Sequence, residues 1–153
     1  MVPFTKAIKN FYVKSFDFNG RATRAEYWWV RLYLFISLIV LILLFPSIIF
    51  GAFILIHIVP SISLQARRYH DVGEPGSTLF LIIAGFAFCA IFTSAGFPVA
   101  TLGILGKLLI IIYQLILNCT HGQKRDNEYG YNPYGNTHHP TNTNYESVEN
   151  VEL

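Results

Sequence analysis

Two long apolar blocks, separated by a short charged segment, dominate the pattern of this chain. No Lys, Arg, Asp or Glu occurs from Leu32 to Leu64, and from Ser77 to Gln123 the only one is Lys107. A helix needs about 20 apolar residues to cross the hydrocarbon layer of a membrane. Each block is too long for one crossing, and the first has a helix break at Pro46. The pattern predicts four membrane-spanning helices, over about 27–45, 47–64, 78–93 and 99–117.

Residues 1–22 carry an amphipathic pattern. Apolar side chains recur at helical spacing, at Phe4, Ala7, Ile8, Phe11 and Tyr12. The other face holds polar side chains, at Lys6, Lys9, Asn10 and Lys14. We expect a short helix on the cytoplasmic side, which either lies in the membrane surface or packs on the protein's own cytoplasmic loops. A helical moment alone does not choose between these partners.

The first predicted span opens with recognisable signals. Thr23 and Glu26 have the spacing of a capping box, in which each side chain accepts a hydrogen bond from the other residue's amide. The aromatic residues that follow are typical of a membrane interface, namely Tyr27, Trp28, Trp29 and Tyr33. Arg31 lies one turn further in, and its long side chain can reach back to the headgroups.

The connections between the other spans are short. Gly73 to Gly76 reads as a turn, with Ser77 as the cap of the next helix. Gly85, Cys89 and Thr93 recur every four residues and would let another helix approach closely. From Cys119 onward Asn, Thr, Gly, Pro and Tyr dominate, so residues 119–153 should form an irregular polar cytoplasmic tail, disordered beyond about Asn136.

Composition narrows the class of protein. Only 13% of the residues are charged and the net charge is +2, so no nucleic-acid partner is expected. Cys89 and Cys119 lie in or beside apolar runs and should be free thiols. A short signal peptide with a small-residue cleavage site is not evident, so we expect the first span to remain as a signal anchor.

The distribution of cations predicts the topology. Cations precede or open the first span, lie between the second and third spans, and follow the fourth: Lys6, Lys9, Lys14, Arg21, Arg24, Arg31, Arg67, Arg68, Lys124 and Arg125. The other two connections have no Lys or Arg. By the positive-inside rule, both termini and the Arg67–Arg68 loop lie in the cytoplasm.

Three motifs together resemble a known family. They are Phe18-Asn19-Gly20-Arg21-Ala22-Thr23-Arg24-Ala25-Glu26-Tyr27-Trp28, then Arg67-Arg68-Tyr69-His70-Asp71-Val72-Gly73, then Cys119-Thr120-His121-Gly122 with Asn127-Glu128-Tyr129-Gly130. In this order they resemble the domain of unknown function 805 (DUF805) family of small bacterial inner-membrane proteins. The resemblance implies a protein of the cytoplasmic membrane and no particular activity.

The first two motifs would meet on the cytoplasmic side of the predicted bundle. Their charged residues can then form one rim, made of Arg21, Arg24, Glu26, Arg67, Arg68, His70 and Asp71. One interpretation is a polar clasp that fixes how the helical hairpins dock. The other is an anion site, because the arginines outnumber the carboxylates and suit a phospholipid phosphate or a phosphorylated ligand.

Other polar residues suggest further hypotheses. His70 beside Asp71 could act as a general base or metal ligand, but one adjacent pair lacks the further ligands or nucleophile that such chemistry needs. We therefore expect no catalytic residue, metal or cofactor. His57, Lys107 and Gln114 are polar positions inside the predicted membrane segments. They could serve conduction, or they could snorkel and hydrogen-bond to neighbouring helices.

These observations predict an all-α integral membrane protein. We expect four transmembrane helices in two hairpins (residues 23–118), an N-terminal amphipathic helix and a C-terminal tail. The first functional hypothesis is a non-enzymatic adaptor or regulatory protein of the bacterial inner membrane that binds anionic lipid headgroups, a partner protein or a second copy of itself. The second is an oligomeric channel or transporter that uses Lys107, His57 and Gln114. An enzyme that acts on lipid headgroups through His70 and Asp71 comes third.

Overall fold

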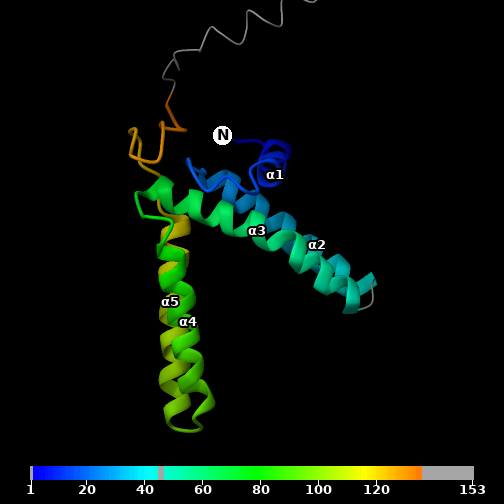
Figure 1. Ribbon diagram of the computed structural model, residues 1–153, viewed down its shortest axis with the longest axis vertical. Helices are drawn as coiled ribbons and strands as arrows, with labels where there is room; N and C mark the ends of the chain where they lie inside the picture. Colours follow the sequence, from blue (N-terminus) through cyan, green and yellow to red (C-terminus); the bar gives the residue numbers. More distant parts are fainter. Residues whose placement is uncertain (1, 45–46, 136–153) are drawn as a thin grey trace, which may run out of the picture.

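The computed structural model describes residues 2–44 and 47–135, and these residues form an all-helical fold. The helices are α1 (Phe4–Val13), α2 (Arg24–Leu44), α3 (Ser47–Val72), α4 (Thr78–Ser94) and α5 (Val99–Cys119). Figure 1 shows α2 and α3 as one hairpin and α4 and α5 as another, and the two diverge from the end where α3 leads into α4. Helix α1 lies against the first hairpin near that end.

The helices agree with most of the predicted spans. Three segments are long and apolar enough to cross a membrane: Arg24–Leu44, Ile49–Val72 and Val99–Cys119. Helix α4 is also apolar but has 17 residues, at the lower end of the usual range of about 17–25 for a span. The predicted break at Pro46 and the tail beyond Gly135 lie outside the described residues.

Helix α3 is longer than predicted. The sequence placed its end near Leu64 and put Arg67 and Arg68 in a loop, which is wrong, because the helix continues to Val72. Every residue from 63 to 71 is buried, so this last part of the helix is enclosed by other segments. Its charged side chains are paired with other groups in this interior, so they do not have to lie in an exposed loop. The turn predicted after it is present, with Gly73 at a φ of +88°.

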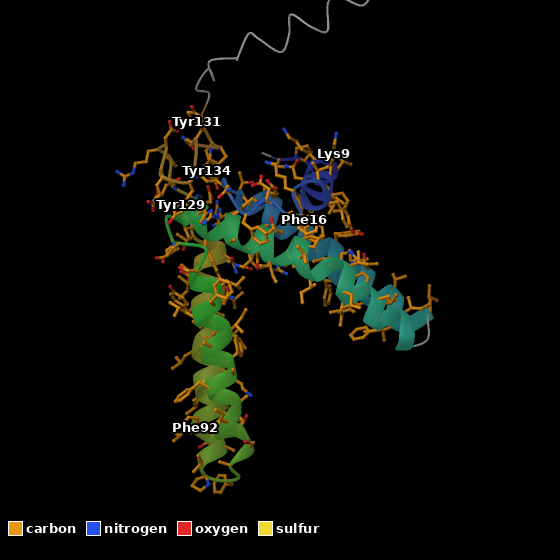
Figure 2. All side chains as sticks on the ribbon, in the orientation of Figure 1. Lys9, Phe16, Phe92, Tyr129, Tyr131 and Tyr134 are labelled. Atoms are coloured by element: carbon orange, nitrogen blue, oxygen red, sulfur yellow. The ribbon has the colours of Figure 1, made fainter. Side chains whose placement is uncertain are left out.

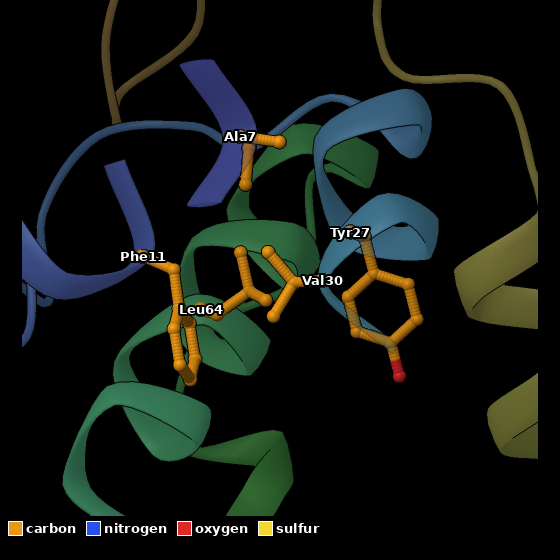
Figure 3. Packing of buried hydrophobic residues seen from close by; sticks show 6 residues of the cluster. Ala7, Phe11, Tyr27, Val30 and Leu64 are labelled. Atoms are coloured by element: carbon orange, nitrogen blue, oxygen red, sulfur yellow. The ribbon is translucent and has the colours of Figure 1, made fainter. Parts of the chain in front are cut away.

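A small hydrophobic core joins α1 to the first hairpin. Figure 3 shows its members, which are Ala7, Phe11, Ala22, Tyr27, Val30 and Leu64. Helix α1 therefore packs on the protein's own helices through Ala7 and Phe11. Large apolar side chains elsewhere on α2–α5 remain exposed, as Leu55 and Leu109 illustrate at 73% and 68%. Such an extensive apolar surface is expected of helices that face lipid.

Helices α4 and α5 pack closely through small residues. A Cβ atom at Gly103 would lie 2.6 Å from the carbonyl oxygen of Cys89, and one at Gly106 would lie 2.6 Å from the Cys89 sulfur. At Gly85 a Cβ atom would lie 3.0 Å from Ile110. The predicted stripe of Gly85, Cys89 and Thr93 thus forms part of this contact. Glycine at 103 is required by space, because the neighbouring atoms belong to the backbone of α4.

We predict that Gly103→Ala destabilises the second hairpin. The added methyl group would push α4 and α5 apart, and overpacking of this kind costs about 1–3 kcal/mol. Gly51→Ala is the matched control, since a Cβ atom there meets nothing within 4 Å. Thermal unfolding in detergent should show a lower midpoint for Gly103→Ala and an unchanged or higher midpoint for Gly51→Ala. Equal midpoints for the two variants would contradict the close packing.

Candidate functional site

Five charged residues from three parts of the chain form a buried cluster, which we call the polar hub: Arg21, Glu26, Arg67, Arg68 and Asp71. Arg21 precedes α2, Glu26 lies in its first turn, and the other three belong to the end of α3. None of their side chains is more than 7% exposed. The rim predicted from the sequence is therefore an interior cluster at these five positions.

Asp71 is the centre of the polar hub. Its Oδ1 lies 3.0 Å from Nη2 of Arg21, and its Oδ2 lies 2.5 Å from Nη1 of Arg68. The hydroxyl of Tyr134 also donates to Oδ2, at 2.5 Å. Burial and the Asp71 carboxylate raise the pKa of Tyr134 to about 12, so this hydroxyl keeps its proton near neutral pH. One carboxylate thus joins the loop before α2, the end of α3 and the C-terminal segment.

Glu26 and Arg67 form a second buried pair, at 3.4 Å between Oε1 and Nη1. One half of the predicted capping box is present, because the amide of Glu26 donates to the hydroxyl of Thr23 at 3.2 Å. The other half is wrong, since the Glu26 carboxylate is engaged by Arg67 instead of the amide of Thr23. A buried guanidinium without a counter-charge costs more free energy than one amide without a capping acceptor at a helix terminus.

The arginines also fix the segment that follows α5. Arg68 donates to the carbonyl of Thr120, and Arg21 donates to the carbonyls of Gln123 and Arg125. The backbone amide of Gln123 in turn donates to the carbonyl of Asp71, at 2.8 Å. Gly122 passes so close to the Asp71 carboxylate that any side chain there would overlap with it. Residues 120–134 are therefore irregular, as predicted, but docked on the hub.

His70 has a positioning role in this structure. Its Nδ1 donates to the carbonyl of Gly20 at 3.1 Å, and its Nε2 accepts the amide of Gly76 at 3.1 Å. The ring of Tyr129 stacks on it at 3.9 Å between centroids, and Figure 2 shows Tyr129 beside the end of α3. Both ring nitrogens are bonded to backbone, so His70 and Asp71 do not form a hydrogen-bonded pair with each other.

The charges in the hub do not cancel. Three buried guanidinium groups face two carboxylates, which leaves one positive charge in excess. Within the described residues, Nε and Nη2 of Arg67 and Nε of Arg68 are buried without a hydrogen-bond partner. Arg24 is different, because it is only half-buried and its side chain donates to the carbonyl of Cys119 at 3.1 Å. The seven predicted rim residues thus lie together, with Arg24 on the outside.

The three predicted intramembrane polar residues do not meet. Lys107 donates to the hydroxyl of Thr93 at 3.1 Å, and His57 hydrogen-bonds to the hydroxyl of Tyr12 at 2.8 Å. Gln114 accepts a hydrogen bond from Tyr69 at 2.7 Å. Lys107 and His57 lie on different hairpins, which diverge (Figure 1).

Sequence reasoning missed several partners of these residues. Gln65 and Asn118 hydrogen-bond to each other at 2.9 Å and connect α3 to α5. A signal for Asn118 was present, because it follows Gln114 by one helical turn in an apolar run. Tyr134 was missed, and Gly122 was noted only as part of the third motif, because nothing in a polar, irregular stretch indicates that it folds back on the hub. The described residues contain no group of three or more His, Cys, Asp or Glu side chains arranged to hold a metal ion.

Fold and hub together define an all-helical membrane protein in which buried ion pairs join α2 to α3. Hydrogen bonds from the same arginines attach the segment after α5. The family model described as protein of unknown function (DUF805) matches residues 15–131. The chain belongs to this family, and the matched region contains all five residues of the polar hub. Tyr134, which donates a hydrogen bond to Asp71, lies just beyond the matched region. No curated protein and no solved structure matches the chain.

We predict that Asp71→Asn strongly destabilises the fold. The substitution removes the charge that compensates Arg21 and Arg68, and breaking a buried ion pair costs about 3–5 kcal/mol. Glu74→Gln, a carboxylate just beyond α3 that takes part in no ion pair among the described residues, is the control. Unfolding midpoints of the two purified variants should differ by many degrees. A wild-type midpoint for Asp71→Asn would show that the hub does not hold the hairpins together.

Proposed function

We propose that the protein is a four-span, multi-pass and non-enzymatic adaptor of the bacterial inner membrane. The fourth span is α4, which is short for a span but packs closely against α5 through Gly103 and Gly106. Two helices joined in this way enter the membrane as one hairpin. The cations of the chain then favour the hub, α1 and the segment after α5 on the cytoplasmic side, with both termini.

The proposed activity is binding of anionic lipid headgroups around Arg24. A surface pocket of about 590 Å³ lies between Arg24 and the indole rings of Trp28 and Trp29. Arg24 has no carboxylate partner among the described residues, so its charge is available to a phosphate. Tryptophan next to a cation is the usual arrangement at the level of the headgroups. This pocket is the observation that carries the proposal.

The surroundings of Arg24 support the same function. Lys6 and Lys9 are exposed on α1, and Figure 2 shows Lys9 pointing away from the hairpins. Each basic residue close to an anionic surface contributes about 1 kcal/mol of attraction. Helix α1 would lie at this surface as the predicted amphipathic helix, with Ala7 and Phe11 toward the protein and its lysines toward the headgroups.

The other two hypotheses have less support. A channel would need Lys107, His57 and Gln114 along one path, and each has a different hydrogen-bond partner. An enzyme would need His70 free to exchange a proton. A pocket of about 420 Å³ does adjoin His70. However, both ring nitrogens of His70 are hydrogen-bonded to the backbone, one to Gly20 and the other to Gly76.

The topology can be tested with single cysteines in a Cys89→Ala, Cys119→Ser background. Ala95→Cys, between α4 and α5, should react with a membrane-impermeant maleimide in intact spheroplasts. Lys9→Cys and Lys124→Cys should react only after lysis, because we place them in the cytoplasm. All three positions are exposed. Equal labelling of positions 95 and 124 in intact spheroplasts would contradict a crossing by α5.

We predict that Arg24→Met removes the preference for anionic headgroups. In a Trp28→Phe background, Trp29 reports on the Arg24 pocket, and brominated lipids quench its fluorescence on contact. Brominated phosphatidylglycerol should compete about fivefold better than brominated phosphatidylcholine, and Arg24→Met should bring this ratio close to one. Lys124→Met, which removes an exposed cation elsewhere, should leave the ratio unchanged. A ratio retained in Arg24→Met would refute lipid binding at this pocket.

A further inference from the structure

A second cavity opens between the two hairpins, just below the polar hub. Its volume is about 630 Å³, which is within the range of ligand-binding cavities. Its walls are apolar and come from both hairpins, through Trp28, Leu32, Phe35, Phe86, Ile111 and Leu115. Its polar lining is concentrated in Tyr27, Arg31, Gln65, Gln114 and Asn118. We call this space the inter-hairpin cleft.

Arg31 brings an uncompensated positive charge to the inter-hairpin cleft. Its guanidinium turns back over the ring of Tyr27, 4.9 Å from the centroid, as expected for a cation that reaches toward the headgroups. Its Nη2 donates to Oε1 of Gln65 at 2.9 Å. No carboxylate pairs with Arg31 among the described residues. The three arginines of the hub, in contrast, all have a carboxylate partner.

The orientation of the amides beside Arg31 follows from its chemistry. A guanidinium can only donate, so the Gln65 atom that it contacts must be the oxygen. The Gln65 nitrogen then donates to Oδ1 of Asn118 at 2.9 Å, which leaves the Asn118 nitrogen to face Oε1 of Gln114 at 3.4 Å. Oε1 of Gln114 also accepts the Tyr69 hydroxyl.

The hydrogen bonds between these amides therefore all run in one direction, from the nitrogen of one residue to the oxygen of the next. Its oxygen atoms are used within the protein, and the Nε2 group of Gln114 is left without a protein partner among the described residues. The polar lining of the cleft therefore offers N–H donors, from Arg31 and Gln114, and it has an excess positive charge. An oxyanion is the ligand that fits such a lining.

We propose that the inter-hairpin cleft binds one anionic phospholipid. The phosphate oxygens accept hydrogen bonds from Arg31 and Gln114, and the acyl chains run along the apolar walls. Arg31 lies at a suitable depth for a headgroup phosphate, because it is seven residues after the start of α2, or about 10 Å along the helix. The proposal rests on the membrane placement proposed above but not on the Arg24 pocket. The two pockets share Trp28 and Leu32, but Arg24 lines only the first and Arg31 only the inter-hairpin cleft.

The bound lipid also accounts for the shape of the molecule. The hairpins diverge from the hub (Figure 1), and the facing apolar side chains Phe35 and Ile111 are 61% and 44% exposed. In a bilayer this wedge-shaped space cannot hold water, because its walls are apolar. A lipid anchored at the polar end fills it and holds the two hairpins at a fixed separation.

Native mass spectrometry of the full-length protein tests the proposal. The purified protein is given equal amounts of phosphatidylglycerol and phosphatidylcholine in a mild detergent. We expect one phosphatidylglycerol to remain bound, with a preference of about tenfold over phosphatidylcholine. Arg31→Met keeps the length of the side chain and removes its charge, and it should reduce this preference to about one.

The matched control is Arg24→Met, which should retain the tightly bound phosphatidylglycerol while it loses the headgroup preference reported by Trp29. Loss in Arg24→Met with retention in Arg31→Met would overturn the cleft proposal and leave the Arg24 pocket intact. If Arg31→Met fails to fold, Gln114→Met takes its place, and a tenfold preference retained in that variant would overturn the proposal. Wild-type protein that binds both lipids equally would also overturn it.

Discussion

The structure depends on one buried carboxylate that is shared by two buried guanidinium groups. Ionised groups lose several kcal/mol when they leave water, so Asp71, Arg21 and Arg68 can be buried only together. Because these residues come from the loop before α2 and from α3, their pairing joins the two segments. The same arginines hold the carbonyls after α5, which adds the second hairpin to the assembly.

This dependence has a physical reason in a membrane protein. Apolar contacts between helices contribute little to association in lipid, because lipid tails are as apolar as the helix surfaces they replace. The hydrophobic core is correspondingly small and lies beside α1 (Figure 3). Its three members in the predicted spans, Tyr27, Val30 and Leu64, are close to the ends of those spans. Buried ion pairs therefore fix α2 against α3, and hydrogen bonds from the same arginines fix the segment after α5. Close packing at Gly103 fixes the two helices of the second hairpin.

The sequence was sufficient to predict the parts of the fold that depend on contact with lipid, namely the apolar helices. Hydropathy placed α2, α4 and α5 to within a few residues. The charged motifs indicated a cluster of Arg21, Arg24, Glu26, Arg67, Arg68, His70 and Asp71, which includes all five residues of the hub. The end of α3 was misplaced because charged residues normally mark a loop, whereas here they are neutralised by partners that are distant in sequence. Residues 120–134 are held mostly through their backbone carbonyls. The sequence of side chains does not show which carbonyls accept hydrogen bonds.

The arginines of this protein differ in burial, and under the proposed function this difference separates their roles. Arg21, Arg67 and Arg68 are enclosed by protein, so their charges must be balanced by Glu26 and Asp71, and what remains is a structural clasp. Arg24 and Arg31 lie on either side of residue 27, where the sequence predicts the first span to begin, and neither has a carboxylate partner among the described residues. A cation at such a predicted lipid boundary can be balanced by a headgroup phosphate instead. Residue type and spacing left open the choice between clasp and binding site. Under the proposed function, that choice depends on whether the partner charge belongs to the protein or to the lipid.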